Sequence, residues 1–184
     1  MELLTFNPEI TIANIATIIA ALPVSFTAIY AGLQWRSNLL FERSRYMEKL
    51  IEKITSDEVI VEVLYMFEYD QEWYSEEFHE NEELELKIDK TLSFLTYICY
   101  LRSQKIITDA EFGFFKYQIV RVLSNEQLED YLYNLYHFTQ RMPNAEITYK
   151  YLLEYAIQNK LFDEDFKNKD AYKYNKKYHH NINF

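Results

Sequence analysis

The chain has 184 residues, with 29 acidic against 19 basic side chains and a formal net charge of -10. So acidic a surface repels phosphate polymers, which argues against nucleic acid as a partner. Only two glycines and three prolines occur, and 17% of the residues are aromatic, which argues against flexible linkers, β architectures with many turns, and disorder. We expect an all-α protein in which one N-terminal transmembrane helix continues into a cytoplasmic bundle of about five helices.

The first predicted element is a membrane span. Residues 10–35 contain no Asp, Glu, Lys or Arg and consist mainly of Ile, Ala, Leu, Val and Phe. About 20 helical residues cover a hydrocarbon layer of about 30 Å, so this segment is long enough to cross it. The alternatives are a buried core helix and a cleaved signal peptide, and the two acids and missing bases of residues 1–9 argue against the latter. Pro23 predicts a kink within the span.

The flanking charges predict the orientation of this helix. Acids alone precede it, whereas its C-terminal side carries five bases, and basic flanks stay in the cytoplasm. We expect a single-pass protein of the inner (cytoplasmic) membrane, with residues 1–9 outside, residues 36–160 as a cytoplasmic bundle and residues 161–184 as a polar tail. The five basic residues are Arg36, Arg43, Arg45, Lys49 and Lys53.

Small and hydroxyl-bearing residues recur along one side of the predicted span, at steps of four, four, three and four. Such a stripe lets membrane helices approach closely, which favours self-association through the membrane helix or the bundle. The alternative is that small residues are simply tolerated there. The predicted membrane-helix packing residues are Thr17, Ala21, Ser25, Ala28 and Gly32.

Apolar residues at helical spacing predict the bundle. The first helix continues to about Ile54, and Thr55-Ser56-Asp57 indicates a stop followed by a new N-cap. The second helix buries Ile60, Val63, Leu64 and Phe67, and the third runs from about Asn81 to Arg102. Capping boxes at Thr108–Glu111 and Ser124–Gln127 predict two further starts, and a last helix is expected from about Ala145 to Asn159.

The segment from Asp57 to Leu86 holds twelve acids and no Lys or Arg. It is either a surface that docks a basic protein partner or a solvated face that keeps the chain soluble. The predicted acidic docking surface consists of Glu68, Asp70, Glu72, Glu76, Glu77, Glu80, Glu82 and Glu83.

No residue pattern supports catalysis, so we expect a protein that is not an enzyme and has no cofactor or metal. Glu76 and His79 form one Glu-x-x-His pair, but a di-iron bundle needs the motif twice. No glycine-rich phosphate loop or nucleophile–histidine pattern occurs. An alternative function is a membrane-tethered sensor of a small ligand, with a pocket lined by Phe94, Tyr97, Phe115 and Tyr131.

Three segments carry a resemblance to a known group of proteins. They are Leu39-Leu40-Phe41-Glu42-Arg43-Ser44-Arg45 after the predicted span, residues 89–95, and residues 105–112. In layout the chain resembles uncharacterised bacterial and phage-associated membrane proteins, some of them described as abortive-infection proteins. The resemblance implies a membrane-anchored interaction protein that acts as an oligomerising effector in defence against phage, and it offers no catalytic residues.

Overall fold

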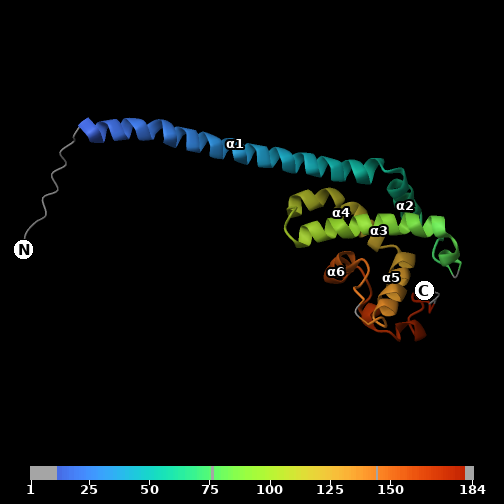
Figure 1. The fold of residues 1–184 in the computed structure, drawn as a ribbon. Helices are drawn as coiled ribbons and strands as arrows, with labels where there is room; N and C mark the ends of the chain where they lie inside the picture. Colours follow the sequence, from blue (N-terminus) through green and yellow to red (C-terminus); the bar gives the residue numbers. More distant parts are fainter. Residues whose placement is uncertain (1–11, 76, 144, 181–184) are drawn as a thin grey trace, which may run out of the picture. The chain divides into compact units, whose positions relative to one another are not determined.

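The computed structural model describes residues 12–75, 77–143 and 145–180 (Figure 1). Within these ranges it contains six α-helices, three short 3-10 helices and no strand, which confirms the predicted all-α class. The chain divides into two compact units, Met1–Glu48 and Lys49–Phe184. The elements are α1 (Ile12–Ser56), α2 (Glu58–Glu68), η1 (Phe78–Glu80), α3 (Glu82–Ser103), α4 (Asp109–Leu123), α5 (Glu126–Thr139), α6 (Lys150–Gln158), η2 (Glu164–Lys167) and η3 (Ala171–Lys173).

The first unit consists of the greater part of α1, whose described apolar side chains are turned to solvent. Eight large apolar residues between Phe26 and Phe41 are 52% to 71% exposed. Arg45 forms an ion pair with Glu42 at 3.6 Å, and its guanidinium lies 5.7 Å from the centre of the Phe41 ring. Among the helices of the described ranges, none combines the length and the apolarity that crossing a bilayer requires.

In the second unit α3 is the central helix, in contact with α2, α4 and α6. Figure 1 shows it in green, with α2 and α4 beside it. Its inward side chains are fully buried because apolar residues recur every three or four positions and so line one face. They include Ile88, Leu92, Leu95, Ile98 and Leu101.

Local capping sets two of the predicted helix starts. The Asp57 carboxylate accepts a hydrogen bond from the Ile60 N–H at 3.3 Å, and α2 begins at Glu58, so that Asp57 alone separates it from α1. At α4 the predicted capping box is present: the Glu111 N–H donates to Thr108 Oγ1 at 3.2 Å, and the Thr108 N–H donates to Glu111 Oε2 at 2.7 Å. Both predictions are confirmed.

Two other predicted starts are wrong. Asn125, not Ser124, caps α5, because its Oδ1 accepts from the Leu128 N–H at 3.0 Å while the Ser124 hydroxyl donates back to the Val120 carbonyl. The last helix begins at Lys150 rather than about Ala145. The physical reason is the backbone of Tyr149. Its φ of 55° is left-handed and does not fit a right-handed helix, so α6 starts at the next residue.

Residues 161–180, described above as part of a polar tail, contribute to the core of the second unit. Phe162, Phe166, Ala171 and Tyr178 are buried, and the short helices η2 and η3 lie within this segment. The rings of Phe166 and Tyr178 pack against Tyr133 of α5. The packed unit therefore extends well past residue 160.

Candidate functional site

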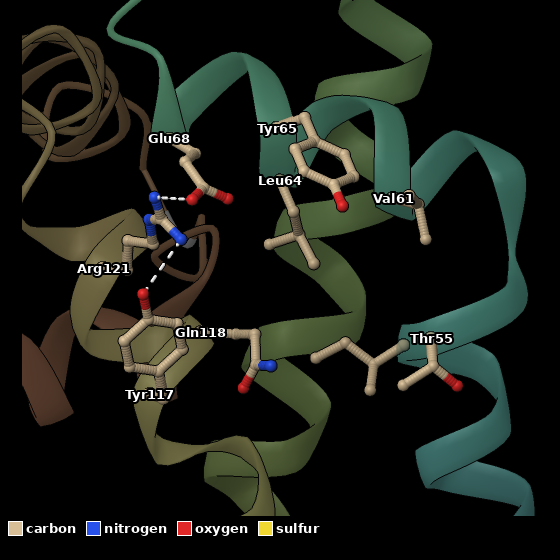
Figure 2. Close-up of a pocket in the computed structure, with 9 residues that line it drawn as sticks. Thr55, Val61, Leu64, Tyr65, Glu68, Tyr117, Gln118 and Arg121 are labelled. Carbon is tan, nitrogen blue, oxygen red and sulfur yellow. Dashed lines mark hydrogen bonds and ion pairs between the residues drawn. The ribbon is translucent and has the colours of Figure 1, made fainter.

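One groove of the second unit lies between α2 and α4, with a volume of about 260 Å³. Figure 2 shows Val61, Leu64 and Tyr65 entering it from α2, opposite Tyr117 and Gln118 of α4. Ile54 and Thr55, at the end of α1, complete its lining. Mostly apolar walls with a few polar groups are typical of a binding groove.

The polar groups of this groove lie toward one end and on its α4 wall. Arg121 forms an ion pair with Glu68, and its Nη1 donates to the Tyr117 hydroxyl at 3.1 Å (Figure 2). Gln118 Oε1 is buried and has no hydrogen-bond partner within the described part of the chain. The carboxamide therefore offers an acceptor, while the ion pair closes one end with no net charge.

The outer face of α4 continues this surface. Phe114 and Tyr117 are 64% and 66% exposed, although they lie in a helix whose opposite face is completely buried. A shallow and almost wholly apolar hollow follows the same helix, lined by Gly113, Lys116, Tyr117, Val120 and Arg121. A contiguous exposed apolar patch of this kind is typical of a protein interaction site.

The predicted acidic docking surface is divided in the structure. Glu68 is paired with Arg121, Asp70 accepts from Asn125 Nδ2 at 3.1 Å, and Glu83 pairs with Lys87 at 3.0 Å. Glu76 lies outside the described residues. The remaining four side chains are exposed and form no ion pair with a described residue: Glu72, Glu77, Glu80 and Glu82.

The predicted membrane-helix packing residues fall mostly outside the description. The side chains of Thr17, Ala21, Ser25 and Ala28 lie outside the described residues, although the backbone at these positions belongs to α1. Gly32 is exposed, and a Cβ added to it would meet nothing within 4 Å. A role of this stripe in self-association stays a prediction.

The aromatic residues named for a ligand sensor do not gather at one hollow. Phe94, Phe115 and Tyr131 are buried, whereas Tyr97 is 43% exposed. Tyr131 packs against Trp73, Tyr74 and Phe78 instead. None of the four lines any of the five described hollows, so the sensor function stays a prediction.

Sequence reasoning missed a pair of buried carboxylates on α5, Glu129 and Asp130. Glu129 Oε1 accepts from the Tyr178 hydroxyl at 2.6 Å and from the Asp163 N–H at 2.8 Å, and Lys177 lies 2.7 Å from Glu129 Oε2. Burial, together with the hydrogen bond to Glu129, raises the pKa of Tyr178, so its hydroxyl remains a donor. The sequence signal that could have revealed this site is the position of Glu129, an acidic residue among the buried leucines of α5, Leu128 and Leu132.

Asp130 holds His179, near the C-terminal end of the described residues, in a similar way. Its Oδ2 lies 2.8 Å from His179 Nδ1, and its Oδ1 accepts from the His179 N–H at 2.8 Å. Burial raises the pKa of Asp130. A hollow of about 450 Å³ opens beside this pair, with Tyr74 and Lys176 in its lining, but no Ser, Thr or Cys lines it. The pair therefore orients the chain and has no hydroxyl or thiol nucleophile of the triad kind beside it.

Among the described residues, neither the Cys99 thiol nor the possible metal ligands form a reactive centre. Burial raises the pKa of the Cys99 thiol to about 12, so the thiol stays protonated at neutral pH. Over the described ranges, no three His, Cys, Asp or Glu side chains are grouped so as to hold a metal ion. Comparison of the chain with protein-family models, curated proteins and solved structures gave no match.

Proposed function

We propose that this protein is a membrane-anchored helical interaction protein. The N-terminal helix lies in the inner (cytoplasmic) membrane, and the folded unit from Lys49 onward presents a protein-binding surface in the cytoplasm. The observation that carries the proposal is the exposure of the large apolar side chains of α1. Side chains such as Phe26, Ile29 and Leu33, each more than 60% exposed, need lipid or another chain to cover them.

The sequence supports lipid as that cover. Residues 10–35 lack ionisable Asp, Glu, Lys and Arg side chains altogether, and each such group at the centre of a span costs about 2.5–3.5 kcal/mol. This proposed span begins at residue 10, outside the described residues, which start at Ile12. The bases from Arg36 to Lys53 support a cytoplasmic location for the folded unit.

The groove between α2 and α4, with the exposed apolar face of α4, supports the interaction role. An enzyme needs reactive groups that converge on one point. This surface instead combines apolar walls with one free hydrogen-bond acceptor, Gln118 Oε1, and the ion pair of Arg121 and Glu68, whose charges cancel. We therefore assign the partner to the protein class. A role in defence against phage stays a prediction of the resemblance stated above.

Extraction of membranes with alkaline carbonate tests the anchor. The full-length protein is expected to remain in the membrane pellet, whereas the variant Phe26→Arg/Ile29→Arg is expected to move into the supernatant. Phe114→Arg/Tyr117→Arg, which places the same charges on the exposed face of α4, is the matched control and should stay in the pellet. Wild-type protein in the carbonate supernatant would refute the proposal.

A further inference from the structure

The guanidinium of Arg102, in the last turn of α3, is held by side chains of two other helices. Its Cζ atom lies 4.6 Å from the centre of the Phe112 ring of α4 and 5.3 Å from the centre of the Tyr155 ring of α6. The two rings pack against each other at 5.3 Å and are 2% and 5% exposed, so the guanidinium lies over an aromatic corner of the core. Contacts of this kind hold the planar group of an arginine against the ring faces.

The nitrogens of this guanidinium are only partly used within the described part of the chain. Arg102 Nε donates to Asp109 Oδ1, at the start of α4, over 2.8 Å. The terminal groups Nη1 and Nη2 donate no hydrogen bond to another described residue. They form a planar pair of donors, the geometry that binds two oxygens of one carboxylate or phosphate group at once. The Arg102 side chain is 37% exposed, so a ligand can reach them.

Arg102 lines a hollow of about 290 Å³ to which α3, α4 and α6 all contribute residues. Lys105 lines it as well, is exposed, and forms no ion pair with a described residue. Tyr151, Tyr155 and buried Cys99 supply less polar lining. The volume is near the lower end of the range of about 300–1,000 Å³ that small-molecule sites occupy. The hollow therefore suits a small anion rather than a polymer.

Two acids share the lining with these two bases, so the hollow has no formal net charge. Asp109 is engaged by Arg102 Nε. Glu154 is exposed and forms no ion pair with a described residue. Binding of an anion here therefore depends on the fixed geometry of the guanidinium more than on net charge, and Glu154 should weaken it.

We propose that this hollow binds a small oxyanion, a carboxylate or a phosphate group, with two of its oxygens accepting hydrogen bonds from Arg102 Nη1 and Nη2. Phe112, Tyr155 and Asp109 keep the guanidinium in its binding orientation, and Lys105 contributes a second positive charge. The site goes beyond the proposed function and does not depend on it, because none of its residues lines the groove between α2 and α4.

Thermal unfolding of the full-length protein in detergent, at constant ionic strength, tests the site with sodium benzoate, benzamide and inorganic phosphate as probes. Benzoate or phosphate is expected to raise the melting temperature with saturation. Benzamide has the shape of benzoate without its charge and should have little effect. A response to one of the two anions alone supports the site and assigns the ligand to that group. No saturable response to either anion, or an equal response to benzamide, would overturn the proposal.

Substitutions in the lining locate the bound anion. Arg102→Lys keeps the charge but loses the planar pair of donors, so it is expected to weaken anion binding about tenfold. Lys105→Gln should weaken it about threefold, and Glu154→Gln should strengthen it about threefold. Lys116→Gln, at an exposed lysine of α4 outside the hollow, is the matched control and should bind as the wild type does.

The exposed positions keep the test informative if Arg102→Lys lowers the stability of the fold. Lys105 and Glu154 are both exposed, so their substitution removes no core contact. Opposite shifts in affinity for Lys105→Gln and Glu154→Gln would support the site. Wild-type affinity in both variants would overturn the proposal, since the anion would then bind elsewhere on the protein.

Discussion

The Tyr178 hydroxyl donates a hydrogen bond of 2.6 Å to Glu129 Oε1, and each of the two residues is 2% exposed. This contact joins the C-terminal segment to α5 across 49 residues of sequence. Glu129 also accepts from the Asp163 N–H and pairs with Lys177. One buried carboxylate therefore holds three parts of the segment from 161 to 180 in place.

Removing that carboxylate should detach the segment. Glu129→Ala leaves the Tyr178 hydroxyl and the Asp163 N–H without their acceptor, and breaking a buried ionic group from its partners costs about 3–5 kcal/mol of unfolding free energy. Thermal unfolding of the full-length protein, followed by tyrosine and tryptophan fluorescence, measures the loss. Exposed Glu126→Ala should cost less than about 1 kcal/mol. Equal effects of the two variants would show that the Glu129 contacts contribute little.

Gln127 should be a second point of attachment, between α5 and the loop after α2. Its Oε1 accepts from the N–H groups of Trp73 and Tyr74 at 2.8 and 3.0 Å, and its Nε2 donates to the Gln71 carbonyl at 3.1 Å. Gln127→Ala removes all three bonds and should cost about 2–3 kcal/mol.

The matched variant is Gln127→Glu, which keeps the acceptor and loses only the donor, so it should cost about 1 kcal/mol. Hydrogen exchange at the amides of Trp73 and Tyr74 provides a local measurement. Exchange there is expected to become faster in Gln127→Ala and to remain near the wild-type rate in Gln127→Glu. Unchanged exchange in Gln127→Ala would contradict this role.

His137 should make the stability of the second unit depend on pH. Burial lowers the pKa of His137 below its usual value of 6.5, and its Nε2 lies 3.1 Å from the Phe166 carbonyl. Below about pH 6.5 the His137 imidazole therefore binds a proton more readily in the unfolded chain than in the folded chain. The contribution of His137 to the free energy of unfolding is present above pH 6.5 and is lost as the pH falls through the lowered pKa of the folded state.

The expected result is a fall in melting temperature between pH 7.5 and pH 5 that is smaller in His137→Gln, which cannot titrate but still offers a donor to the carbonyl. Asp130 acts in the opposite sense: burial raises its pKa, so its contribution decreases as the pH rises from 3.8 through the raised value. Comparison above pH 5 with Asp130→Asn separates the two groups. An identical pH dependence in wild type and His137→Gln would refute the assignment to His137.

The small-residue stripe of the proposed membrane helix gives a prediction about self-association. Replacing Ala21, Ser25 and Ala28 by Leu fills the surface through which membrane helices approach, so association through that helix should be lost. The mass of this variant in detergent, compared with that of the wild type, measures the loss. If the triple Leu variant keeps its wild-type mass, the stripe has no part in assembly.

Local sequence signals predicted much of the fold, and long-range contacts account for the rest. Asp57, Thr108 and the apolar stripe of α3 act within a few residues, so pattern alone was sufficient for them. The start of α6 was not predictable in this way, because Tyr149 takes a left-handed conformation while its hydroxyl donates to Asp89, 60 residues away, at 2.5 Å.

The candidate sites show the same division. The acidic segment from Asp57 to Leu86 is obvious as composition, yet which of its acids remain unpaired depends on Lys87 and Arg121, which come later in the chain. Glu129 and Asp130 were missed because their partners lie in a segment whose polar composition indicated no packing. The exposed apolar face of α4, with Phe114 and Tyr117, was not predicted because the periodic pattern of the buried face of this helix is stronger.

The depth of α1 in a bilayer tests the central claim most directly. Spin labels are placed at Phe26→Cys and Leu40→Cys of the full-length protein in lipid vesicles, with buried Cys99 left in place. Collisions with oxygen and with a water-soluble nickel complex then report depth. Membrane anchoring predicts that the label at 26 collides with oxygen and is shielded from nickel, whereas the label at 40 is accessible to nickel. Equal access of nickel to both positions would contradict a membrane-anchored protein.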